Sequence, residues 1–246
     1  ELTEFASLKI SLRCKYTLQQ KQVRGSYLYL QYPKAIVAIC NTMSKLTKEM
    51  NLNSHNPLIS VVITTFNGER YLKQQIDSVL EQTYKNLEII VLDDCSNDGT
   101  VEIITAYIEK DNRITFIRND NTLGYIKNFE KGFAIAKGEF IAPCDQDDIW
   151  LPNKIEVLLT NIENDVIAYC NSEIINGEGV STGKKMSDVK RLIDYNNPLM
   201  FAIGNAAPGH AMLIRASFLK ETFPYPTIIP HDYWLGFIAT FNSKLK

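Results

Sequence analysis

The sequence predicts an α/β fold in which helices cover both faces of a mostly parallel central sheet. From residue 57 onward, apolar runs rich in β-branched residues alternate with amphipathic segments, an order typical of βαβ units. The first two runs are largely apolar, as expected of strands buried on both faces. Residues 1–56 do not join the alternation and predict a short N-terminal extension, with a helix expected over 35–50.

The first strand is expected at residues 58–64 (LISVVIT) and the second at 87–92 (LEIIVL). Between them, Leu72, Ile76 and Val79 recur at helical spacing, which predicts a helix. The other predicted strands are 113–118, 139–143, 166–170 and a short segment at 210–215. The predicted helices are 68–83, 98–110, 124–137, 151–163 and 231–240.

Two residues are expected to mark helix ends. Asp98 is the expected N-cap of the second helix, because its side chain can accept a backbone N–H, and Gly138 is the expected C-terminal cap of the third. After residue 170 the alternation weakens. Residues 176–185 are rich in Gly and Ser and predict a loop or hairpin tip, and the two prolines in 225–230 predict a loop.

Charge is unevenly distributed along the chain. Residues 1–56 hold eight Lys or Arg and three Glu, a net charge of +5, whereas the remainder carries −7. A basic arm on an acidic body is compatible with contact to anionic lipid or nucleic acid, and equally with a solvated face. We expect no nucleic-acid partner and consider peripheral membrane contact through residues 1–56. The longest apolar run, 27–40, is too short and too interrupted to span a bilayer.

The five cysteines are widely spaced and include no Cys-x-x-Cys pair. This pattern disfavours a disulfide framework or a zinc site and predicts a reducing, cytoplasmic location. No signal peptide opens the chain, although Glu1 need not be the native start.

Several enzyme classes lack their sequence signals here. No Gly-x-Gly-x-x-Gly follows a predicted strand, which disfavours a dinucleotide-binding oxidoreductase, and no Gly-x-Ser-x-Gly elbow is present. A sugar-phosphate nucleotidyltransferase would need a Gly-rich loop with Arg and Lys after the first strand, where residues 65–68 are TFNG.

The most informative run is residues 145–148 (DQDD), directly after a predicted strand. Three carboxylates in four residues repel one another unless a cation or backbone donors compensate them. Oxygen ligands suit Mg²⁺ or Mn²⁺, which typically bridge to substrate phosphates. The alternative is an exposed acidic turn that caps the following helix. Polar clusters also follow the first two strands, at 64–67 and 93–98, and ligands of such folds bind beyond the carboxyl ends of the strands.

Taken together, these motifs resemble the family-2 glycosyltransferases, which are nucleotide-sugar-dependent, inverting enzymes of the A-type glycosyltransferase fold. The resemblance covers roughly residues 57–241, and the order of its motifs makes it specific. The motifs are VVITTFN at 61–67, LEQTY at 80–84, VLDDCSNDGT at 91–100, NTLG at 121–124, DQDD at 145–148 and HDYW at 231–234. The DQDDIWLP and HDYW versions look most like the rhamnosyltransferase-like branch, which builds bacterial surface polysaccharides.

The resemblance implies a donor site at the strand ends. Its residues would be Thr64, Phe66 and Asn67 around the base and ribose, Glu69 near the ribose, Asp94 on a base N–H, and Asn128 shaping the pocket. The alternative for these positions is ordinary turn and helix-end chemistry. Asp93 and Asp98 are expected to be structural.

The resemblance also implies a metal site and a base. Asp147 would be the more direct ligand of Mg²⁺ or Mn²⁺, while Asp145 would reach the metal, a metal-bound water or the ribose. Asp232 would take the proton from the acceptor hydroxyl, although it could also be the N-cap of the last helix. Three neighbours remain open: His231 could tune Asp232 or be exposed, Trp234 could stack on a sugar or pack in the core, and His210 could contact phosphate or acceptor or be structural.

The predicted function is therefore metal-dependent, inverting transfer of a hexosyl or deoxyhexosyl group from a UDP- or dTDP-linked donor. The acceptor would be the hydroxyl of a glycan or lipid-linked acceptor, in surface polysaccharide synthesis. Residues 57–147 would bind the nucleotide, and residues 148–246 would hold the acceptor and the base. The expected location is cytoplasmic, with the inner face of the membrane as one site of action. The alternative is a degenerate or C-terminally truncated module that binds nucleotide sugar or glycan without turnover.

Overall fold

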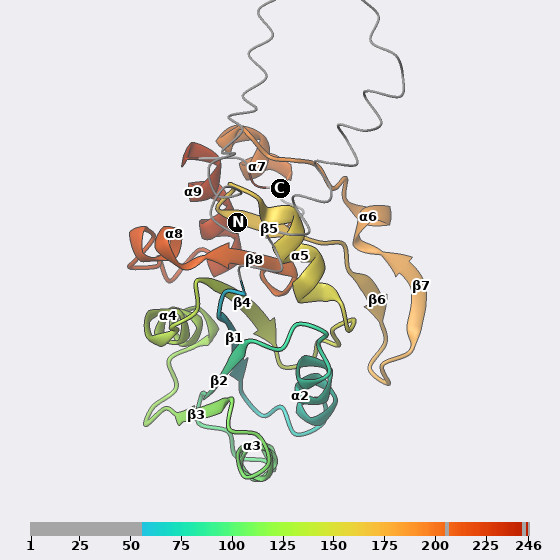
Figure 1. Ribbon diagram of the computed structural model, residues 1–246, viewed down its shortest axis with the longest axis vertical. Helices are drawn as coiled ribbons and strands as arrows, with labels where there is room; N and C mark the ends of the chain where they lie inside the picture. The colour runs from blue at the N-terminus through green and yellow to red at the C-terminus, as the bar shows by residue number, and fades with distance from the viewer. Residues whose placement is uncertain (1–55, 205–206, 243–244, 246) are drawn as a thin grey trace, which may run out of the picture. The chain divides into compact units, whose positions relative to one another are not determined.

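Six strands form the central sheet of the computed structural model, in the order β3-β2-β1-β4-β8-β5 (Figure 1). The structure describes residues 56–204, 207–242 and 245, which lie in one unit of the chain. The strands are β1 (Ile59–Thr65), β2 (Leu87–Asp93), β3 (Ile114–Arg118), β4 (Phe140–Asp145), β5 (Ile167–Tyr169) and β8 (Met212–Arg215). β1 to β4 are parallel, and β8 runs antiparallel to its neighbours β4 and β5. The predicted mostly parallel sheet is confirmed.

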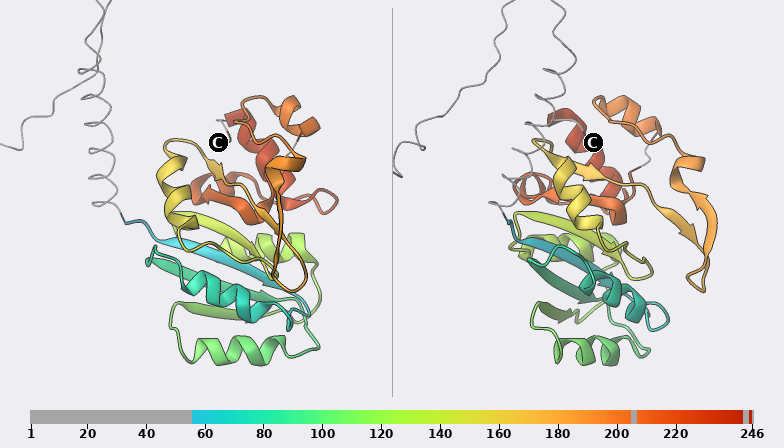
Figure 2. Two further views of the ribbon diagram at one scale, coloured as in Figure 1. Left: turned by 90° about the vertical axis from the view of Figure 1, so that its right-hand side faces the viewer. Right: turned by 45° about the vertical axis from the view of Figure 1, so that its right-hand side comes forward.

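Helices cover both faces of this sheet, as predicted (Figure 2). The helices of the first face are α2 (Leu72–Leu80), α3 (Thr100–Ile108) and α5 (Lys154–Ile162). Those of the second face are α4 (Tyr125–Ile135), α7 (Pro198–Gly204), α8 (Ala216–Glu221) and α9 (His231–Asn242). Successive residues of β1 enter two separate hydrophobic clusters: Val61 belongs to the cluster of the first set of helices, and Val62 to that of the second. This alternation explains why the strand is apolar along its whole length.

A two-stranded hairpin lies beside the sheet, formed by β6 (Glu173–Ile175) and β7 (Ser181–Lys185) (Figure 1). The tip, predicted at 176–185, covers 176–180, and the rest of that range forms β7. Arg70, just before α2, donates from Nη2 to the Gly177 carbonyl at the tip, at 3.1 Å. The short helix α6 (Met186–Val189) follows the hairpin.

The register of the parallel strands brings the predicted polar clusters to one edge of the sheet. Thr65 at the end of β1 lies opposite Asp93 at the end of β2. Thr64 lies opposite Asp145 at the end of β4. Because all three strands end at the same level, the residues that follow them face one region.

Two predicted helix caps are wrong in detail. α3 begins one residue later than expected, with Gly99 as its N-cap, although the Asp98 carboxylate still accepts the Thr100 N–H at 3.1 Å. α4 ends at Ile135, so Gly138 is not its cap. Gly138 instead lies against β1, where a Cβ would come within 2.6 Å of the Ser60 backbone nitrogen. The position needs glycine because the main chain passes too close to β1 for a side chain.

The predicted helix at 35–50, and all but the last residue of the predicted extension 1–56, lie outside the described residues. Among the helices of the described ranges, none combines the length and apolar character that a membrane span requires.

Candidate active site

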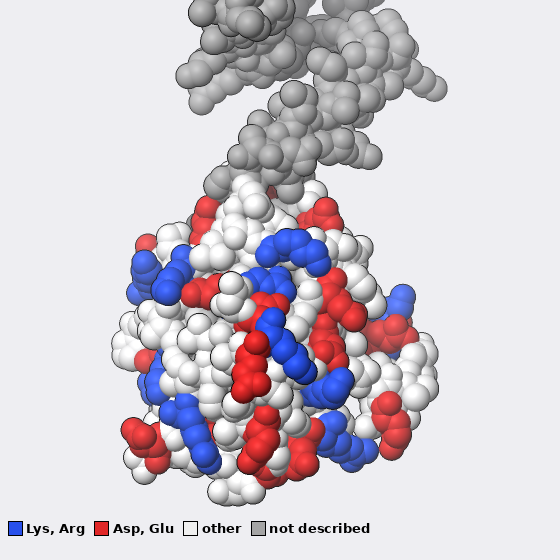
Figure 3. All heavy atoms as spheres, turned by 60° about the horizontal axis from the view of Figure 1, so that its bottom comes forward, with Lys and Arg blue, Asp and Glu red and all other residues white. Residues whose placement is uncertain are grey.

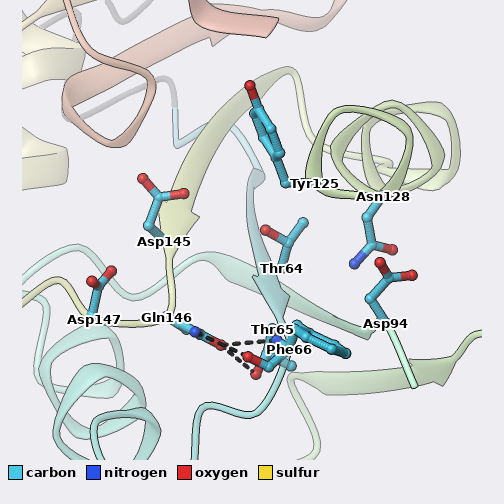
Figure 4. Close-up of a pocket in the computed structure, with 9 residues that line it drawn as sticks. All are labelled: Thr64, Thr65, Phe66, Asp94, Tyr125, Asn128, Asp145, Gln146 and Asp147. Carbon is cyan, nitrogen blue, oxygen red and sulfur yellow. Dashed lines mark hydrogen bonds between the residues drawn. The ribbon is translucent and has the colours of Figure 1, made fainter. Parts of the chain in front are cut away.

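A pocket of about 210 Å³ opens at the carboxyl ends of β1, β2 and β4 (Figure 4). Nine residues from these strand ends and from the start of α4 form its wall. They are Thr64, Thr65, Phe66, Asp94, Tyr125, Asn128, Asp145, Gln146 and Asp147. Six of them were predicted from the sequence as donor or metal residues, so the structure brings these side chains to one place.

The pocket has an aromatic side chain at each of two borders. Phe66 follows β1 and Tyr125 opens α4, and both rings are about half exposed, at 47% and 54%. In Figure 4 they stand on opposite sides of the pocket, with Asp94 and Asn128 along one flank and the acidic turn along the other. Exposed aromatic rings of this kind offer flat apolar faces for a base or a sugar.

Two predicted donor residues, Asn67 and Glu69, lie outside the pocket wall and tie loops together. The Asn67 side chain accepts the Asn97 N–H at 2.9 Å, and Glu69 accepts the Gly99 N–H at 3.0 Å. Asn67 has a φ of 50°, in the left-handed region that Asn tolerates. These contacts join the β1–α2 loop to the β2–α3 loop, and a direct contact of either residue with the donor stays a prediction.

Asp94 is buried, and its carboxylate is surrounded by donors. It accepts the backbone N–H groups of Leu123 and Gly124 at 2.8 and 2.9 Å, and the Asn119 side-chain amide at 2.8 Å. Asn119 also donates to the Asn128 side chain at 3.0 Å. Three bonds leave a carboxylate at least one acceptor position, so the predicted contact with a base N–H remains available. Sequence reasoning missed Asn119, a residue just past β3.

Gln146 holds the ends of β1 and β4 together. Its Oε1 accepts the Thr65 hydroxyl and the Phe66 N–H, both at 2.9 Å, and its Nε2 donates to the Phe66 carbonyl at 3.2 Å. The middle residue of the Asp-x-Asp motif thus fixes the backbone that carries Phe66, one border of the pocket.

The acidic run folds into a turn that brings its first and fourth residues together. The Asp148 N–H points to the Asp145 carbonyl at 3.4 Å, and the carboxylates of both residues approach His210. His210 Nδ1 lies 3.8 Å from Asp145 Oδ2 and 3.9 Å from Asp148 Oδ2. One ligand atom from each of these three residues lies within 4.8 Å of the others. Asp147 occupies the exposed corner of the turn and lies outside this cluster, so its direct metal ligation stays a prediction.

The cluster gathers two partly buried carboxylates, and the Lys154 ammonium opposes the cost of burying Asp148 only in part. Burial and the neighbouring Asp148 charge raise the pKa of Asp145 to about 6. Burial likewise raises the pKa of Asp148 to about 6, against the opposing effect of the Lys154 charge. Asp148 Oδ2 is buried and has no hydrogen-bond partner in the structure. Burial, helped by the Lys154 charge, lowers the pKa of His210, which favours the neutral imidazole that metals bind.

These observations fit a divalent cation. The donor set of two carboxylates and one imidazole is suited to Mn²⁺, and the orphaned buried oxygen is a group that a cation would satisfy. Sequence reasoning weighed His210 only as a phosphate, acceptor or structural contact, and it did not single out Asp148. The one available signal was the acidic run itself.

Asp232, the predicted base, is joined to this cluster by the short helix η1 (Gly209–Ala211). Its Oδ2 accepts the Gly209 N–H at 3.1 Å, and its Oδ1 accepts the Tyr233 N–H at 2.8 Å. The next residue of η1 is His210. Asp232 is close enough for its charge to raise the pKa values of both Asp145 and His210. It lies within the first turn of α9, which begins at His231, and is therefore not the helix N-cap.

His231 and Trp234 of the HDYW motif both pack against the second hydrophobic cluster, and tuning of Asp232 by His231 stays a prediction. His231 is buried, so the expectation that it could be exposed is wrong; its ring lies 4.2 Å from that of Phe129, and neither ring nitrogen has a partner. Trp234 packs against the second hydrophobic cluster and donates from Nε1 to the Thr222 carbonyl at 3.0 Å. Core packing, the second of its two predicted roles, is confirmed.

The sequence also matches the family model of glycosyl transferase family 2, over residues 60–223. The chain belongs to glycosyltransferase family 2.

Proteins similar to this family-2 chain include three curated relatives and one solved structure. An uncharacterized glycosyltransferase of Haemophilus influenzae is 31% identical over 212 residues, which span 77% of this chain and 64% of the relative. The Escherichia coli protein WfgD, named as a UDP-Glc:alpha-D-GlcNAc-diphosphoundecaprenol beta-1,3-glucosyltransferase, is 33% identical over 180 residues, covering 72% of this chain and 68% of WfgD. An uncharacterized glycosyltransferase of Rickettsia typhi is 40% identical over 131 residues, covering 52% of this chain and 40% of the relative, so the chain spans less than half of that relative.

The solved structure is the mannosyltransferase PcManGT from Pyrobaculum calidifontis, in complex with GDP-Man and Mn²⁺. It superposes with a TM-score of 0.56 at 18% identity, covering 75% of this chain and 53% of PcManGT. This likeness shows the A-type glycosyltransferase fold. The family assignment and the fold predicted from the sequence are both confirmed, and the rhamnosyltransferase-like branch stays a prediction.

Proposed function

We propose that this family-2 glycosyltransferase moves a sugar from a nucleoside-diphosphate donor to an acceptor hydroxyl, with inversion at the anomeric carbon and with the help of Mg²⁺ or Mn²⁺. The observation that carries the proposal is that two consecutive residues of η1 contact the proposed base and the proposed cation ligands. Gly209 donates to the Asp232 carboxylate, and His210 faces the carboxylates of Asp145 and Asp148. The proposed base and the proposed cation ligands would thereby lie side by side.

The nucleotide would occupy the pocket formed by residues 57–147. Phe66 and Tyr125 offer aromatic faces at its borders, and Asp94 retains an acceptor position for a base N–H. The N3–H of uracil or thymine would be a donor for this carboxylate. UDP- or dTDP-linked sugars are therefore the proposed donors, and the name of WfgD, which specifies UDP-Glc, supports UDP.

The divalent cation would be held by Asp145, Asp148 and His210, with Asp147 at the mouth of the pocket as the further predicted ligand. When bound, the cation would stabilise the negative charge that develops on the departing nucleoside diphosphate. The chain's own contribution is to keep two carboxylates and one neutral imidazole converged before the donor arrives. The Mn²⁺ in the PcManGT structure supports a cation in this fold.

Asp232 would act as the general base. Its two oxygens each accept one backbone N–H, which orients the carboxylate while leaving acceptor positions for a hydroxyl proton. A single positioned carboxylate is what direct displacement requires, because the acceptor oxygen attacks as its proton leaves. We place the acceptor in the half formed by residues 148–246.

The proposed acceptor is a glycan or a lipid-linked saccharide, and the proposed role is surface polysaccharide synthesis at the cytoplasmic face of a membrane. The support is WfgD, whose name specifies a diphosphoundecaprenol-linked acceptor. Membrane contact through residues 1–56 belongs to the same proposal and is testable by vesicle flotation with and without that segment.

The deciding experiment pairs donor binding with transfer. A thermal-shift panel of nucleoside diphosphates and their sugars, with and without Mn²⁺, would identify the donor, because a ligand that binds the folded state stabilises it. Asp232→Asn should retain that donor-induced shift and lose transfer by about 10²–10⁴-fold, the typical worth of a general base. Near-normal turnover in this variant would exclude Asp232 as the base. Donor binding with neither transfer nor donor hydrolysis in the wild-type chain would favour the binding module without turnover.

A further inference from the structure

His210 is held from both sides of its ring. Nδ1 faces the Asp145 and Asp148 carboxylates at 3.8 and 3.9 Å. The opposite nitrogen, Nε2, lies 3.0 Å from the hydroxyl oxygen of Ser172, in the segment between β5 and β6. The ring therefore spans the gap between the acidic turn and a separate loop of the chain.

The main chain of His210 is fixed as well. Lys154, at the start of α5, donates from Nζ to the His210 carbonyl at 2.5 Å. The same ammonium lies 3.5 Å from the centre of the Trp150 ring, a cation–π contact that restrains it further. These contacts fix the backbone that carries the imidazole.

Ser172 is itself anchored. Its carbonyl accepts the Met186 N–H at 2.8 Å, and the neighbouring Asn171 side chain accepts the Ser187 N–H at 3.2 Å. The Ser172 hydroxyl is thus presented to Nε2 by a segment bonded to the start of α6.

We propose that Ser172 is a positioning residue that makes His210 a cation ligand, an inference that rests on the proposed function. A neutral imidazole carries one proton, so Nδ1 offers a lone pair to a cation only when Nε2 carries the hydrogen. The Ser172 oxygen accepts that hydrogen and stabilises this tautomer. Partners of this kind, behind the ligand, commonly change metal affinity by about 10–100-fold when removed.

The test is a Mn²⁺ titration of the metal-free full chain by calorimetry, alone and with UDP present. Ser172→Ala should weaken Mn²⁺ binding by about 10–100-fold. Ser172→Thr, which keeps a hydroxyl, should restore most of the affinity. Ser187→Ala is the matched control, because Ser187 lies in the same neighbourhood but bonds to Asn171 rather than to His210.

Activity supplies a second readout. In Ser172→Ala the Mn²⁺ concentration for half-maximal transfer should rise by a similar factor, while kcat at saturating Mn²⁺ recovers, because the substitution removes no group that touches the donor or acceptor. Thermal unfolding in EDTA should match that of Ser187→Ala, which separates lost affinity from lost fold.

Three outcomes would overturn the inference. Unchanged Mn²⁺ affinity in Ser172→Ala would show that the hydroxyl does not matter, and unchanged affinity in His210→Ala would remove His210 as a ligand. If wild type binds no Mn²⁺ with or without UDP, the metal part of the proposed function fails together with the inference. Binding by wild type but an unaltered Ser172→Ala affinity rejects the inference alone.

Discussion

Carboxylates at the end of β2 and in the acidic turn after β4 differ in how they are satisfied. At the end of β2, Asp93 accepts the Ser96 N–H at 3.0 Å and lies 3.4 Å from the Arg118 side chain, and Asp94 accepts three N–H groups. In the turn after β4, Asp148 Oδ2 is buried without a hydrogen-bond partner. Satisfied acids hold loops in place, whereas an unsatisfied buried acid costs stability unless a ligand compensates it.

The distribution of charge on the surface does not show this difference. On the face seen in Figure 3, acidic and basic side chains are interspersed, without a continuous track of one sign. The contrast becomes visible only in the individual hydrogen-bond partners of each carboxylate.

The largest effect is expected from Gly209→Ala in η1. A Cβ at this position would lie 2.7 Å from His231 Nε2 and 3.2 Å from the Asp232 Cβ, so the segment between base and cluster must shift. We expect transfer to fall by about 10²-fold or more, since a misplacement of about 1 Å can cost that much. Donor-induced thermal shifts should persist, because no pocket-lining residue changes. Full activity would show that η1 is not the link between the two sites.

The next prediction concerns pH and the buried His231. Burial lowers the pKa of His231 from 6.5 to about 4, despite the nearby Asp232 charge. Because the folded state resists protonation, the unfolded state binds more protons between these values. Stability from this residue is present above pH 6.5 and is lost as pH falls toward 4, by an amount on the order of 3 kcal/mol.

Asp145 and Asp148 affect stability with the opposite dependence on pH. Because their pKa values are raised to about 6 in the folded state, the folded state loses stability as pH rises from 4 to 6. Comparing wild type with His231→Phe therefore separates the contribution of the histidine from those of the two carboxylates, which both proteins share. Urea titrations at about pH 4 to 7 give the unfolding free energy of both proteins. As pH falls, the unfolding free energy of wild type should decrease relative to that of the variant. A difference independent of pH would contradict the buried neutral imidazole.

How far the sequence could predict this structure depends on the range of the interactions. β1 and β2 were predictable because a continuous apolar run is enough to indicate a strand buried on both faces. The insertion of β8 between β4 and β5 was not, because strand order depends on pairings distant in the chain. The hydrogen bonds from residues 119–124 to Asp94 could not be predicted either, because they also join positions that are distant in the chain.

The metal cluster shows the same limit on a smaller scale. Spacing alone favours Asp145 and Asp147, because they are two residues apart in the motif. A turn instead brings residues i and i+3 together, so Asp148 joins Asp145 and the third residue sits at the corner. His210 enters only through η1, roughly sixty residues further along the chain, a separation that no local pattern spans.

A direct test of the two kinds of acid compares Asp94→Asn with Asp148→Asn in EDTA. Asp94→Asn should lose about 1–3 kcal/mol, because an amide cannot accept all three N–H groups and presents its own donors to them. Asp148→Asn should be neutral or stabilising without a cation, since it removes the cost of burying a carboxylate whose Oδ2 has no hydrogen-bond partner. Urea denaturation measures both. Added Mn²⁺ should stabilise wild type and Asp94→Asn but not Asp148→Asn; equal losses in the two variants would abolish the distinction.

The smallest expected effect comes from Gln146→Met, which keeps the side chain's length and removes its three hydrogen bonds to Thr65 and Phe66. These bonds lie at the exposed edge of the sheet, so we expect a loss of about 1 kcal/mol in stability. Because Phe66 forms one border of the pocket, the donor KM should rise several-fold while kcat changes little. Gln74→Met, at an exposed position of α2, is the matched control for the substitution itself. A fall in kcat with an unchanged KM would place Gln146 in the chemistry rather than in the pocket wall.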